Sequence, residues 1–318
     1  MKKILVTGGA GFIGSNFIRH ILAKYPDYRV TNLDKLTYCG NLDNLKDIDE
    51  NSNYKFVKGD IADPKIVDRL VKDADVLVNF AAETHVDRSI KDPAGFVRTN
   101  VFGTHTLLEA AKAHGTELFI QISTDEVYGS ISEGAFTESS PIAPNSPYSA
   151  AKAGGDLLAR SYFITHGLPV IITRSSNNFG PYQYPEKVIP LFVTNLLEGK
   201  KVPVYADGSN VRDWLFVIDN CEAIDVVMHK GKVGEVYNIG GGNEITNMEL
   251  TRNLLKLLDK GEEYIEFVKD RPGHDKRYAL DIAKVKTLGW EPRHDFNGAL
   301  ELTVNWYSQN KSWWKKLK

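Results

Sequence analysis

The feature that most constrains the fold is a regular alternation of short apolar runs with helical patterns in the first half of the chain. Six β-rich runs cover residues 3–8, 29–34, 54–60, 74–82, 117–123 and 168–174. Helical patterns between them cover residues 15–24, 63–71 and 93–114. Strands that are apolar on both faces and are separated by helices indicate a parallel sheet covered on both sides. The sequence therefore predicts an α/β fold with a doubly wound parallel sheet.

The rhythm changes after Arg174, where four prolines punctuate a loop-rich region up to residue 203. A further strand over 234–242 and a helix over 247–259 follow. We expect the chain to return to the first domain at about 213–240, so that the second lobe is built from two pieces. The predicted domains are residues 1–174 plus about 213–240, and a smaller, discontinuous α+β lobe of residues 175–212 plus 241–318.

Composition excludes several classes of function. The net charge of -2 gives no basic footprint for nucleic acid and no polybasic membrane surface. No apolar stretch reaches transmembrane length. Two distant cysteines, Cys39 and Cys221, fit a reducing compartment, and the eight histidines show no metal-ligand spacing. We therefore expect a cytoplasmic protein without a metal site, a membrane contact or a nucleic-acid partner.

The segment GGAGFIG places Gly8, Gly11 and Gly14 directly between a predicted strand and a predicted helix. Glycines there permit a tight turn and a close approach of the backbone to a pyrophosphate at the helix N-terminus. Asp34 ends the second strand, where a carboxylate accepts hydrogen bonds from ribose hydroxyls and repels a 2′-phosphate. A tight turn without a ligand is the alternative, but strand, helix and Asp34 together favour a Rossmann-like NAD site. Asp60, at the end of the third strand, is a candidate contact to the adenine.

The segment NSPYSAAK carries a second pattern. Ser146 suits an N-cap and Pro147 the first helical turn, so Tyr148 and Lys152 lie at i and i+4 on one helix face. An ammonium near a phenol favours the phenolate, which predicts a pKa for Tyr148 lowered from about 10. A surface Tyr-Lys pair is the alternative interpretation. The pattern favours a catalytic pair because it follows a nucleotide-binding glycine loop in the sequence.

Three polar residues, Thr124, Asp125 and Glu126, directly follow the strand at 117–123. That position lies at the carboxyl ends of the strands, where such sheets bind ligands. Adjacent residues on a strand point to opposite faces, so both acids can face one ligand only if the strand ends by Thr124 and breaks into a turn. Crowding of two carboxyls in a dry site is expected to keep one of them protonated.

Taken together, the glycine loop, Asp34, Tyr148 and Lys152 resemble the extended short-chain dehydrogenase/reductases, which act mostly on nucleotide sugars. NNFGP (177–181) and VRDWLFV (211–217) resemble segments by which their second lobe holds a nucleotide diphosphate. The Thr-Asp-Glu triplet, AAETHVDRSI (81–90) and DRPGHDKRYA (270–279) resemble one branch, the nucleoside-diphosphate-glucose 4,6-dehydratases. The similarity runs along essentially the whole chain.

The resemblance implies a reaction. The sugar is oxidised at C4 with bound NAD, water is lost across C5 and C6, and hydride returns to C6, so the cofactor stays bound. By this resemblance Glu126 is the base at C5 and Asp125 the acid at the C6 hydroxyl. The resemblance also implies that Thr124 forms a hydrogen bond near O4 and that Tyr148 and Lys152 perform the oxidation. The expected substrate is dTDP-glucose, and UDP-glucose stays open. A nucleotide-sugar epimerase or decarboxylase is the alternative on this scaffold. A non-catalytic dinucleotide sensor is disfavoured, because such proteins tend to lose the tyrosine or the lysine and this chain has both Tyr148 and Lys152.

The resemblance also carries over binding residues by position. Those expected at the cofactor, besides Gly8, Gly11, Gly14, Asp34, Asp60, Tyr148 and Lys152, are Phe12, Ile13, Lys35, Leu36, Thr37, Ile61, Ala81, Ala82, Thr99 and Asn178. Those expected at the substrate are Thr84, Thr124, Asn177, Lys187, Val188, Pro203, Tyr205, Arg212, Asn247, Arg271 and His274. Arg212 and Arg271 are candidates for a bidentate clamp on the diphosphate. A homodimer through the helices at 93–114 and 148–163, and a role in deoxysugar synthesis such as that of rhamnose, are further expectations.

Overall fold

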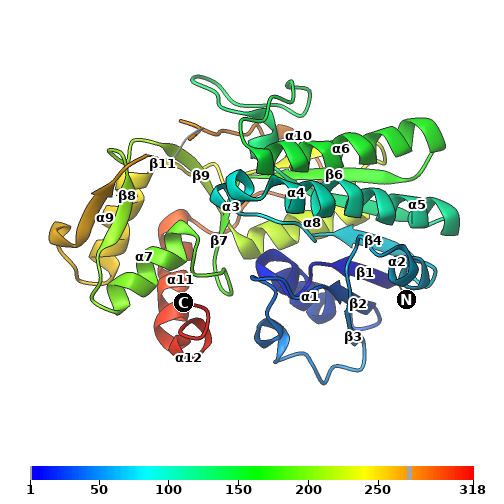
Figure 1. Cartoon of the computed structure of the whole chain (residues 1–318), viewed down its shortest axis with the longest axis horizontal. Coiled ribbons are helices and arrows are strands. Elements are labelled where there is room, and N and C mark those ends of the chain that lie inside the picture. Colours follow the sequence, from blue (N-terminus) through cyan, green and yellow to red (C-terminus); the bar gives the residue numbers. More distant parts are fainter. Residues whose placement is uncertain (1, 271–273) are drawn as a thin grey trace.

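A seven-stranded parallel sheet forms the centre of the first lobe (Figure 1). The computed structural model describes residues 2–270 and 274–318. The strand order is β10-β6-β5-β4-β1-β2-β3. The strands are β1 (Lys3–Thr7), β2 (Arg29–Asp34), β3 (Tyr54–Lys58), β4 (Val76–Asn79), β5 (Leu118–Thr124), β6 (Val170–Ser175) and β10 (Val236–Ile239). The order reverses between β1 and β4, which confirms the doubly wound sheet and opens a crevice at that point.

Helices cover both faces of this sheet, as the apolar strands predict. On one face α1 (Phe12–Lys24) packs against α8 (Val217–Lys230), and on the other α5 (Thr104–His114) packs against α2 (Pro64–Val71) and α6 (Pro147–His166). Ile4 and Val6 of β1 belong to the core on the face that α1 and α8 cover, and Leu5 belongs to the core on the face that α2, α5 and α6 cover. Neighbouring residues of one strand are thus buried on opposite faces, as in parallel sheets covered on both sides.

The helical pattern at 93–114 is interrupted in the structure. It consists of α4 (Pro93–Phe96), the π-helical segment η2 (Val97–Gly103) and α5. Within η2, the Asn100 side chain accepts a hydrogen bond from the Glu83 N–H (2.9 Å) and donates one to the Glu83 carbonyl (3.1 Å). These bonds hold the segment that follows β4, and the short helix α3 (Val86–Lys91) comes directly after it. π-Segments are frequent beside functional sites.

The second lobe has two small sheets and its own core. One sheet has the order β11-β9-β7 and the other pairs β12 with β8. Its strands are β7 (Asn177–Phe179), β8 (Val202–Tyr205), β9 (Val211–Phe216), β11 (Glu244–Thr246) and β12 (Ile265–Val268). Its helices are α7 (Val188–Leu197), α9 (Asn247–Leu257), α11 (Phe296–Gln309) and α12 (Lys311–Trp314). Short turns elsewhere are η1 (Leu42–Leu45), η4 (Glu262–Tyr264) and α10 (Ala283–Lys286).

The chain crosses between the lobes more than once. Helix α8 and strand β10 return to the large sheet, while β9 stays in the second lobe up to Phe216. Val285 and Trp290 also pack into the core of the first lobe, although residues 241–318 are predicted to belong to the second lobe. The domain boundaries near residues 174, 213 and 240 stay a prediction.

Two tryptophans hold helix α12 in place, Trp313 against the first lobe and Trp314 against α11. Trp313 Nε1 donates to Asn44 Oδ1 (2.9 Å), and Asn44 Nδ2 donates to the carbonyl of Ala10 in the glycine loop (2.9 Å). Trp314 Nε1 donates to the Tyr307 carbonyl (2.8 Å). The end of the chain is thus connected to the glycine loop through one asparagine, a contact that no local sequence pattern indicates.

Asp225 forms a buried polar cluster where α1 meets α8. Its carboxylate accepts hydrogen bonds from Lys24 Nζ (2.7 Å) and the Tyr25 hydroxyl (3.0 Å) and lies 2.8 Å from His20 Nε2. Burial opposes ionisation, but the hydrogen bonds from His20, Lys24 and Tyr25 outweigh it and lower the pKa of Asp225 to about 2. The cluster therefore ties α1 to α8 most strongly when Asp225 is charged.

Asp225→Asn is expected to lower the free energy of unfolding at pH 7 by about 2 kcal/mol. The pKa of Asp225 is depressed on folding, so its contribution is complete above about pH 4 and is lost as the pH falls toward 2. Urea unfolding of wild type and variant across this range measures the effect. The two curves should converge at low pH, and a difference independent of pH would contradict the assignment.

Candidate functional site

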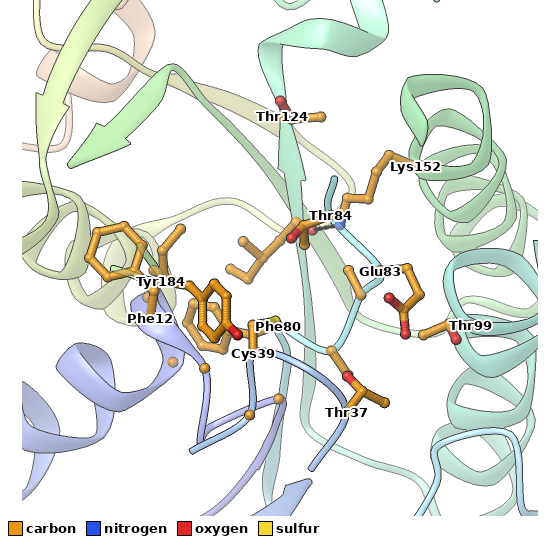
Figure 2. Close-up of a pocket in the computed structure, with 18 of the residues that line it drawn as sticks. Phe12, Thr37, Cys39, Phe80, Glu83, Thr84, Thr99, Thr124, Lys152 and Tyr184 are labelled. Atoms are coloured by element: carbon orange, nitrogen blue, oxygen red, sulfur yellow. Dashed lines mark hydrogen bonds between the residues drawn. The ribbon is translucent and has the colours of Figure 1, made fainter. Parts of the chain in front are cut away.

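A cleft of about 280 Å³ lies at the carboxyl ends of the parallel strands, next to the neighbouring strands β1 and β4, where the strand order reverses. Figure 2 shows side chains arranged around it, with Phe12 and Thr37 from the glycine-loop side and Thr124 and Lys152 from the opposite side. Gln183, Tyr184, Glu186 and Lys187 of the second lobe complete the lining. The site is thus built between a rigid sheet edge and the second lobe.

The glycine loop forms one wall of the cleft. Backbone atoms lie so close to two of its glycines that neither position has room for a side chain. Gly8 has a φ of +70°, and a Cβ there would lie 2.6 Å from the amide nitrogen of Ala81. A Cβ on Gly14 would lie 2.5 Å from the Gly8 carbonyl oxygen. Among the described residues no side chain caps the N-terminus of α1. The first amides of that helix therefore remain suited to an anion such as a pyrophosphate.

Asp34 lies on the cleft beside this loop. It is buried, and its carboxylate accepts hydrogen bonds from the backbone amides of Ala10 (2.9 Å) and Leu36 (2.8 Å). Burial raises the pKa of Asp34, and the two backbone hydrogen bonds act against the rise. Leu36 has a φ of 57° that turns its amide back to Asp34, and it is not among the residues that line the cleft.

Asp60 and Lys35 form an ion pair at the far end of the same wall, with Nζ and Oδ2 2.9 Å apart. Burial opposes ionisation of Asp60, but hydrogen bonds from Lys35 and from the Ala62 amide lower its pKa overall. A carboxylate there suits the adenosine part of NAD and disfavours the 2′-phosphate of NADP.

Of the buried side-chain oxygens in the cleft lining that lack a hydrogen-bond partner within the described chain, three belong to residues predicted for the site. They are Asn177 Oδ1, Asn178 Oδ1 and Asp125 Oδ2. All three residues line the cleft. Because buried polar atoms nearly always find a partner, such atoms in a cleft indicate a polar ligand. Together with the glycine cradle, they fit a dinucleotide along the first wall and a polar substrate beside it.

The acid pair follows a strand that ends where the sequence predicts. Strand β5 stops at Thr124, and the 3-10 turn η3 (Asp125–Tyr128) begins at the next residue. Thr124 Oγ1 accepts a hydrogen bond from the Glu126 amide (3.3 Å) and donates one to Asp125 Oδ1 (3.1 Å). The turn brings both Asp125 and Glu126 to the cleft, which confirms the predicted break.

Asp125 is buried, and its surroundings favour the protonated acid. Burial, followed by the charge of Glu126, raises its pKa well above the ordinary value, and the hydrogen bond from Thr124 opposes this. A carboxyl that keeps its proton near neutral pH can serve as a general acid. This direction agrees with the expectation that one of the two carboxyls stays protonated.

Tyr148 and Lys152 lie in the first turns of α6, which starts with a reciprocal capping box between Ser146 and Ser149. Both side chains are buried and line the cleft. Lys152 Nζ donates to the carbonyl of Ile122 on β5 (2.5 Å), which aims the ammonium at the sheet edge. Helix and strand therefore fix the pair in one place.

The prediction that Lys152 lowers the pKa of Tyr148 is wrong for the chain alone. Burial, followed by the charges of Glu126 and Asp125, raises the pKa of Tyr148 well above its ordinary value. Burial also lowers the pKa of Lys152 to about 8. The sequence pattern shows that the two residues share a helix face, but not that two carboxylates and a dry environment act on the phenol.

The cleft brings together most of the predicted site residues. All five predicted catalytic residues line it, as do the predicted cofactor residues other than Leu36. Of the predicted substrate residues, Thr84, Thr124, Asn177 and Lys187 line it. Those that do not are Val188, Pro203, Tyr205, Arg212, Asn247 and His274, and Arg271 lies outside the described residues.

The predicted substrate residues outside the cleft lie on the second lobe. Arg212 is buried, with its guanidinium donating to the carbonyls of Val211 (2.7 Å) and Asp275 (2.8 Å). It also lies over the ring of Tyr278, 4.5 Å from its centroid. Tyr205 and His274 have ring centroids 5.9 Å apart. Their role toward a nucleotide stays a prediction.

The structure adds cleft residues that sequence reasoning missed. Lys187 Nζ donates to the Thr84 carbonyl (2.9 Å), and Glu186 lies 3.6 Å from Arg88 and 3.8 Å from His85, so the two lobes are bridged here. The prolines at 181–190 indicate a loop between the two lobes and were the one sequence feature that could have pointed to these residues. The missed lining residues are Leu33, Cys39, Gly40, Gly59, Phe80, Glu83, Ile122, Ser123, Ser175, Ser176, Gln183, Tyr184 and Glu186.

Metal-binding and membrane-spanning features are absent from residues 2–270 and 274–318. No group of three or more His, Cys, Asp or Glu side chains in these ranges is arranged to hold a metal ion. No helix within them is long and apolar enough to cross a membrane.

The sheet, the glycine loop with Asp34, and the Tyr148–Lys152 pair define a short-chain dehydrogenase/reductase of the extended, nucleotide-sugar type. Comparisons with known proteins narrow this class. A family model described as GDP-mannose 4,6 dehydratase matches residues 5–303. The chain belongs to this family of nucleotide-sugar 4,6-dehydratases.

Its relatives resemble it over nearly the whole length. It is 57% identical to a dTDP-glucose 4,6-dehydratase of Streptomyces niveus, with 99% of this chain and 96% of the relative covered. It is 58% identical to the low-salt glycan biosynthesis protein Agl12 of Haloferax volcanii, with 96% and 98% covered.

Solved structures agree with this. DesIV, a dTDP-glucose 4,6-dehydratase of Streptomyces venezuelae crystallised with NAD and TYD bound, superimposes with a TM-score of 0.98 at 52% identity, covering 99% of this chain and 100% of the other. A UDP-glucose 4-epimerase of Thermus thermophilus in complex with NAD reaches 0.90 at 31% identity, covering 97% and 99%. Fold alone therefore does not separate dehydration from epimerisation.

Asp34→Asn is expected to reduce the preference for NAD over NADP by about tenfold or more. The variant loses the charge that repels a 2′-phosphate and one acceptor for the ribose hydroxyls. Titration of the nucleotide-free chain with each dinucleotide by calorimetry measures the preference. Asp73→Asn, on the exposed carboxylate of Asp73, is the control and should leave it unchanged. An unaltered preference in Asp34→Asn would contradict the cofactor assignment.

Proposed function

We propose that this chain catalyses the NAD-dependent dehydration of dTDP-glucose to dTDP-4-keto-6-deoxyglucose. The observation that carries the proposal is the meeting of two residue pairs in one cleft. Tyr148 and Lys152 suit oxidation at C4, and the Asp125–Glu126 pair lies beside them on η3. The names of the relatives at 50–57% identity support the same reaction.

Bound NAD supplies the oxidant at C4 and the hydride that returns to C6. Tyr148 accepts the proton of the C4 hydroxyl in its phenolate form. In this proposal the positive charge of Lys152 favours the phenolate and opposes the rise in the pKa of Tyr148 that burial and the two carboxylates cause. Thr124 holds the sugar near O4. These residues perform the step that dehydratases and epimerases share.

The acid pair performs the elimination. A ketone at C4 makes the C5 proton acidic, and Glu126 removes it as general base. Asp125, whose surroundings keep it protonated, gives its proton to the departing C6 hydroxyl. Reprotonation at C5 then completes the product. An epimerisation needs neither of these groups, so the pair favours dehydration over epimerisation or decarboxylation.

The second lobe holds the nucleotide in this proposal. Asn177, Lys187 and Thr84 already line the cleft and suit the sugar side. Val188, Pro203, Tyr205, Arg212, Asn247, Arg271 and His274 are proposed for the base, the ribose and the diphosphate, on the family resemblance alone.

Incubation of the chain with dTDP-glucose and NAD tests the function. The expected result is a product with the alkali-induced absorbance of a 4-keto sugar, formed without net consumption of NAD. Galactose product without keto sugar would contradict the dehydratase proposal and favour an epimerase. Competitive turnover of dTDP-glucose and UDP-glucose then decides between the two nucleotides, and preferred use of UDP-glucose would overturn the dTDP assignment.

We also propose a homodimer, formed through η2, α5 and α6. Large apolar side chains on η2 and α6 are exposed in the single chain, with Val97 53%, Phe102 47%, Leu157 52% and Ile164 63% accessible. Leu157→Glu is expected to give monomers in light scattering after gel filtration. Leu302→Glu changes a similarly exposed leucine on α11 and should leave the dimer intact. Dimers in both variants would contradict this interface.

A cytoplasmic enzyme of deoxysugar synthesis, such as the route to dTDP-rhamnose, is the setting we propose. The relatives named for sugar-nucleotide dehydration and for glycan synthesis support it. Loss of the protein is expected to deplete deoxysugar nucleotides in cell extracts, and unchanged pools would contradict this setting.

A further inference from the structure

Behind the catalytic cleft, a buried ion pair joins α6 to β6. Arg174 Nε lies 3.1 Å from Asp156 Oδ2, and both side chains are almost fully buried, at 5% and 1% accessibility. Separating one buried charge from its partner is costly, so the two are held together. Neither residue lines the cleft.

The pair connects the two elements that carry the proposed catalytic residues, α6 and η3. Arg174 lies next to Ser123 of β5 in the strand register, and its guanidinium lies 4.7 Å from the ring centroid of Tyr128. Tyr128 is the last residue of η3, the turn that carries the acid pair, and its hydroxyl donates to Asn238 Oδ1 (2.8 Å). Through Arg174, α6 and η3 are therefore fastened to the same point of the sheet.

Asp156 lies one helical turn beyond Lys152, and Lys152 one turn beyond Tyr148, on the same face of α6. A negative charge at this position acts on both catalytic groups in the same direction. It favours the Lys152 ammonium, against the burial that lowers the pKa of Lys152 to about 8. It also raises the pKa of Tyr148, after burial and the two nearer carboxylates.

We propose that Asp156, held in place by Arg174, is a positioning residue whose negative charge keeps Lys152 in its charged form on the helix face that it shares with the reacting tyrosine. It acts through Lys152 and contacts neither substrate nor cofactor. The inference rests on the proposed function, because it assigns Lys152 to the oxidation at C4.

Tyr148 and Asp156 share the helix of Lys152, and β5 contributes the Ile122 carbonyl that accepts its hydrogen bond. Two further elements with charged groups pack against α6, η3 with Asp125 and Glu126 and β6 with Arg174. The charge of Asp156 is the one among the described residues that opposes the effect of burial on Lys152. Its removal should therefore lower the pKa of Lys152, and that of Tyr148 with it.

The test is the pH profile of NADH formation in a single turnover of the holoenzyme with dTDP-glucose. For Asp156→Asn, both limbs of the profile are expected to move to lower pH, the alkaline limb by about one unit. A purely structural role would lower the rate by the same factor at every pH. Asp225→Asn removes an equally buried carboxylate between α1 and α8 and should leave the limbs in place.

Arg174→Met provides a second approach to the same group. Without the guanidinium, Asp156 is buried unpaired and takes up a proton, so the profile should shift in the same direction. The double variant Asp156→Asn/Arg174→Met removes both charges and is expected to regain stability while keeping the shifted profile. It carries the test if Asp156→Asn does not fold.

An active wild type whose pH profile is unmoved in Asp156→Asn and in the double variant would overturn this inference alone. A wild type that forms neither NADH nor a keto sugar would instead overturn the proposed function, and the inference with it. A shift restricted to the Asp156 and Arg174 variants, with Asp225→Asn unmoved, supports it.

Discussion

Replacement of Glu126 by Gln is expected to slow product formation by about 100- to 10,000-fold while substrate and NAD still bind. The amide keeps the size of the side chain but cannot accept the C5 proton. Oxidation at C4 does not need Glu126, so reduced cofactor should accumulate when dTDP-glucose is added. Stopped-flow absorbance of NADH, together with quenched assays of keto sugar, separates the two steps.

Glu133→Gln is the matched control, because Glu133 is an exposed residue of the loop after η3. It should retain wild-type rates for both steps. If Glu126→Gln turns over normally and shows no NADH, the assignment of Glu126 as base is wrong.

Tyr148→Phe is expected to reduce the overall rate by a similar factor but with the opposite spectroscopic result. The phenol is the proposed acceptor of the C4 hydroxyl proton, so its loss blocks the first step and no NADH should appear. Substrate affinity, measured by calorimetry, should change little, since the ring remains.

Tyr162→Phe, at a buried tyrosine later in α6 whose hydroxyl donates to Glu109, provides the comparison. It should be fully active. NADH formation at the wild-type rate in Tyr148→Phe would remove Tyr148 from the oxidation step and revive the hypothesis of a non-catalytic dinucleotide sensor.

Much of the first lobe is predictable because its signals are local. Apolar runs place the strands to within two to three residues, and the adjacency of Asp125 and Glu126 predicts the break after Thr124 from stereochemistry alone. The π-segment η2 is not predictable, because it depends on the bond between Asn100 and the backbone of Glu83. The two residues lie 17 positions apart, Asn100 in a predicted helix and Glu83 after a predicted strand, so no local pattern connects them before the chain folds.

The site shows the same division. Residues on the glycine loop, β5 and α6 are predictable because their positions follow from one element each. The direction of the pKa shift of Tyr148 is not, since it depends on charges from η3 and on burial, neither of which a Tyr-x-x-x-Lys pattern contains. Second-lobe residues such as Arg212 and Tyr205 are assigned by resemblance, which gives a position but not its distance from the cleft.

The link from Trp313 through Asn44 to Ala10 has a consequence for the order of events during synthesis. The glycine loop is made before Asn44, and Asn44 gains its tryptophan partner only 269 residues later. A ribosome-bound chain can therefore form the sheet before this support of the dinucleotide loop is complete. Tight binding of NAD is therefore expected only after residue 313 has been made. Nascent chains stalled before residue 313 should exchange NAD faster than released chains.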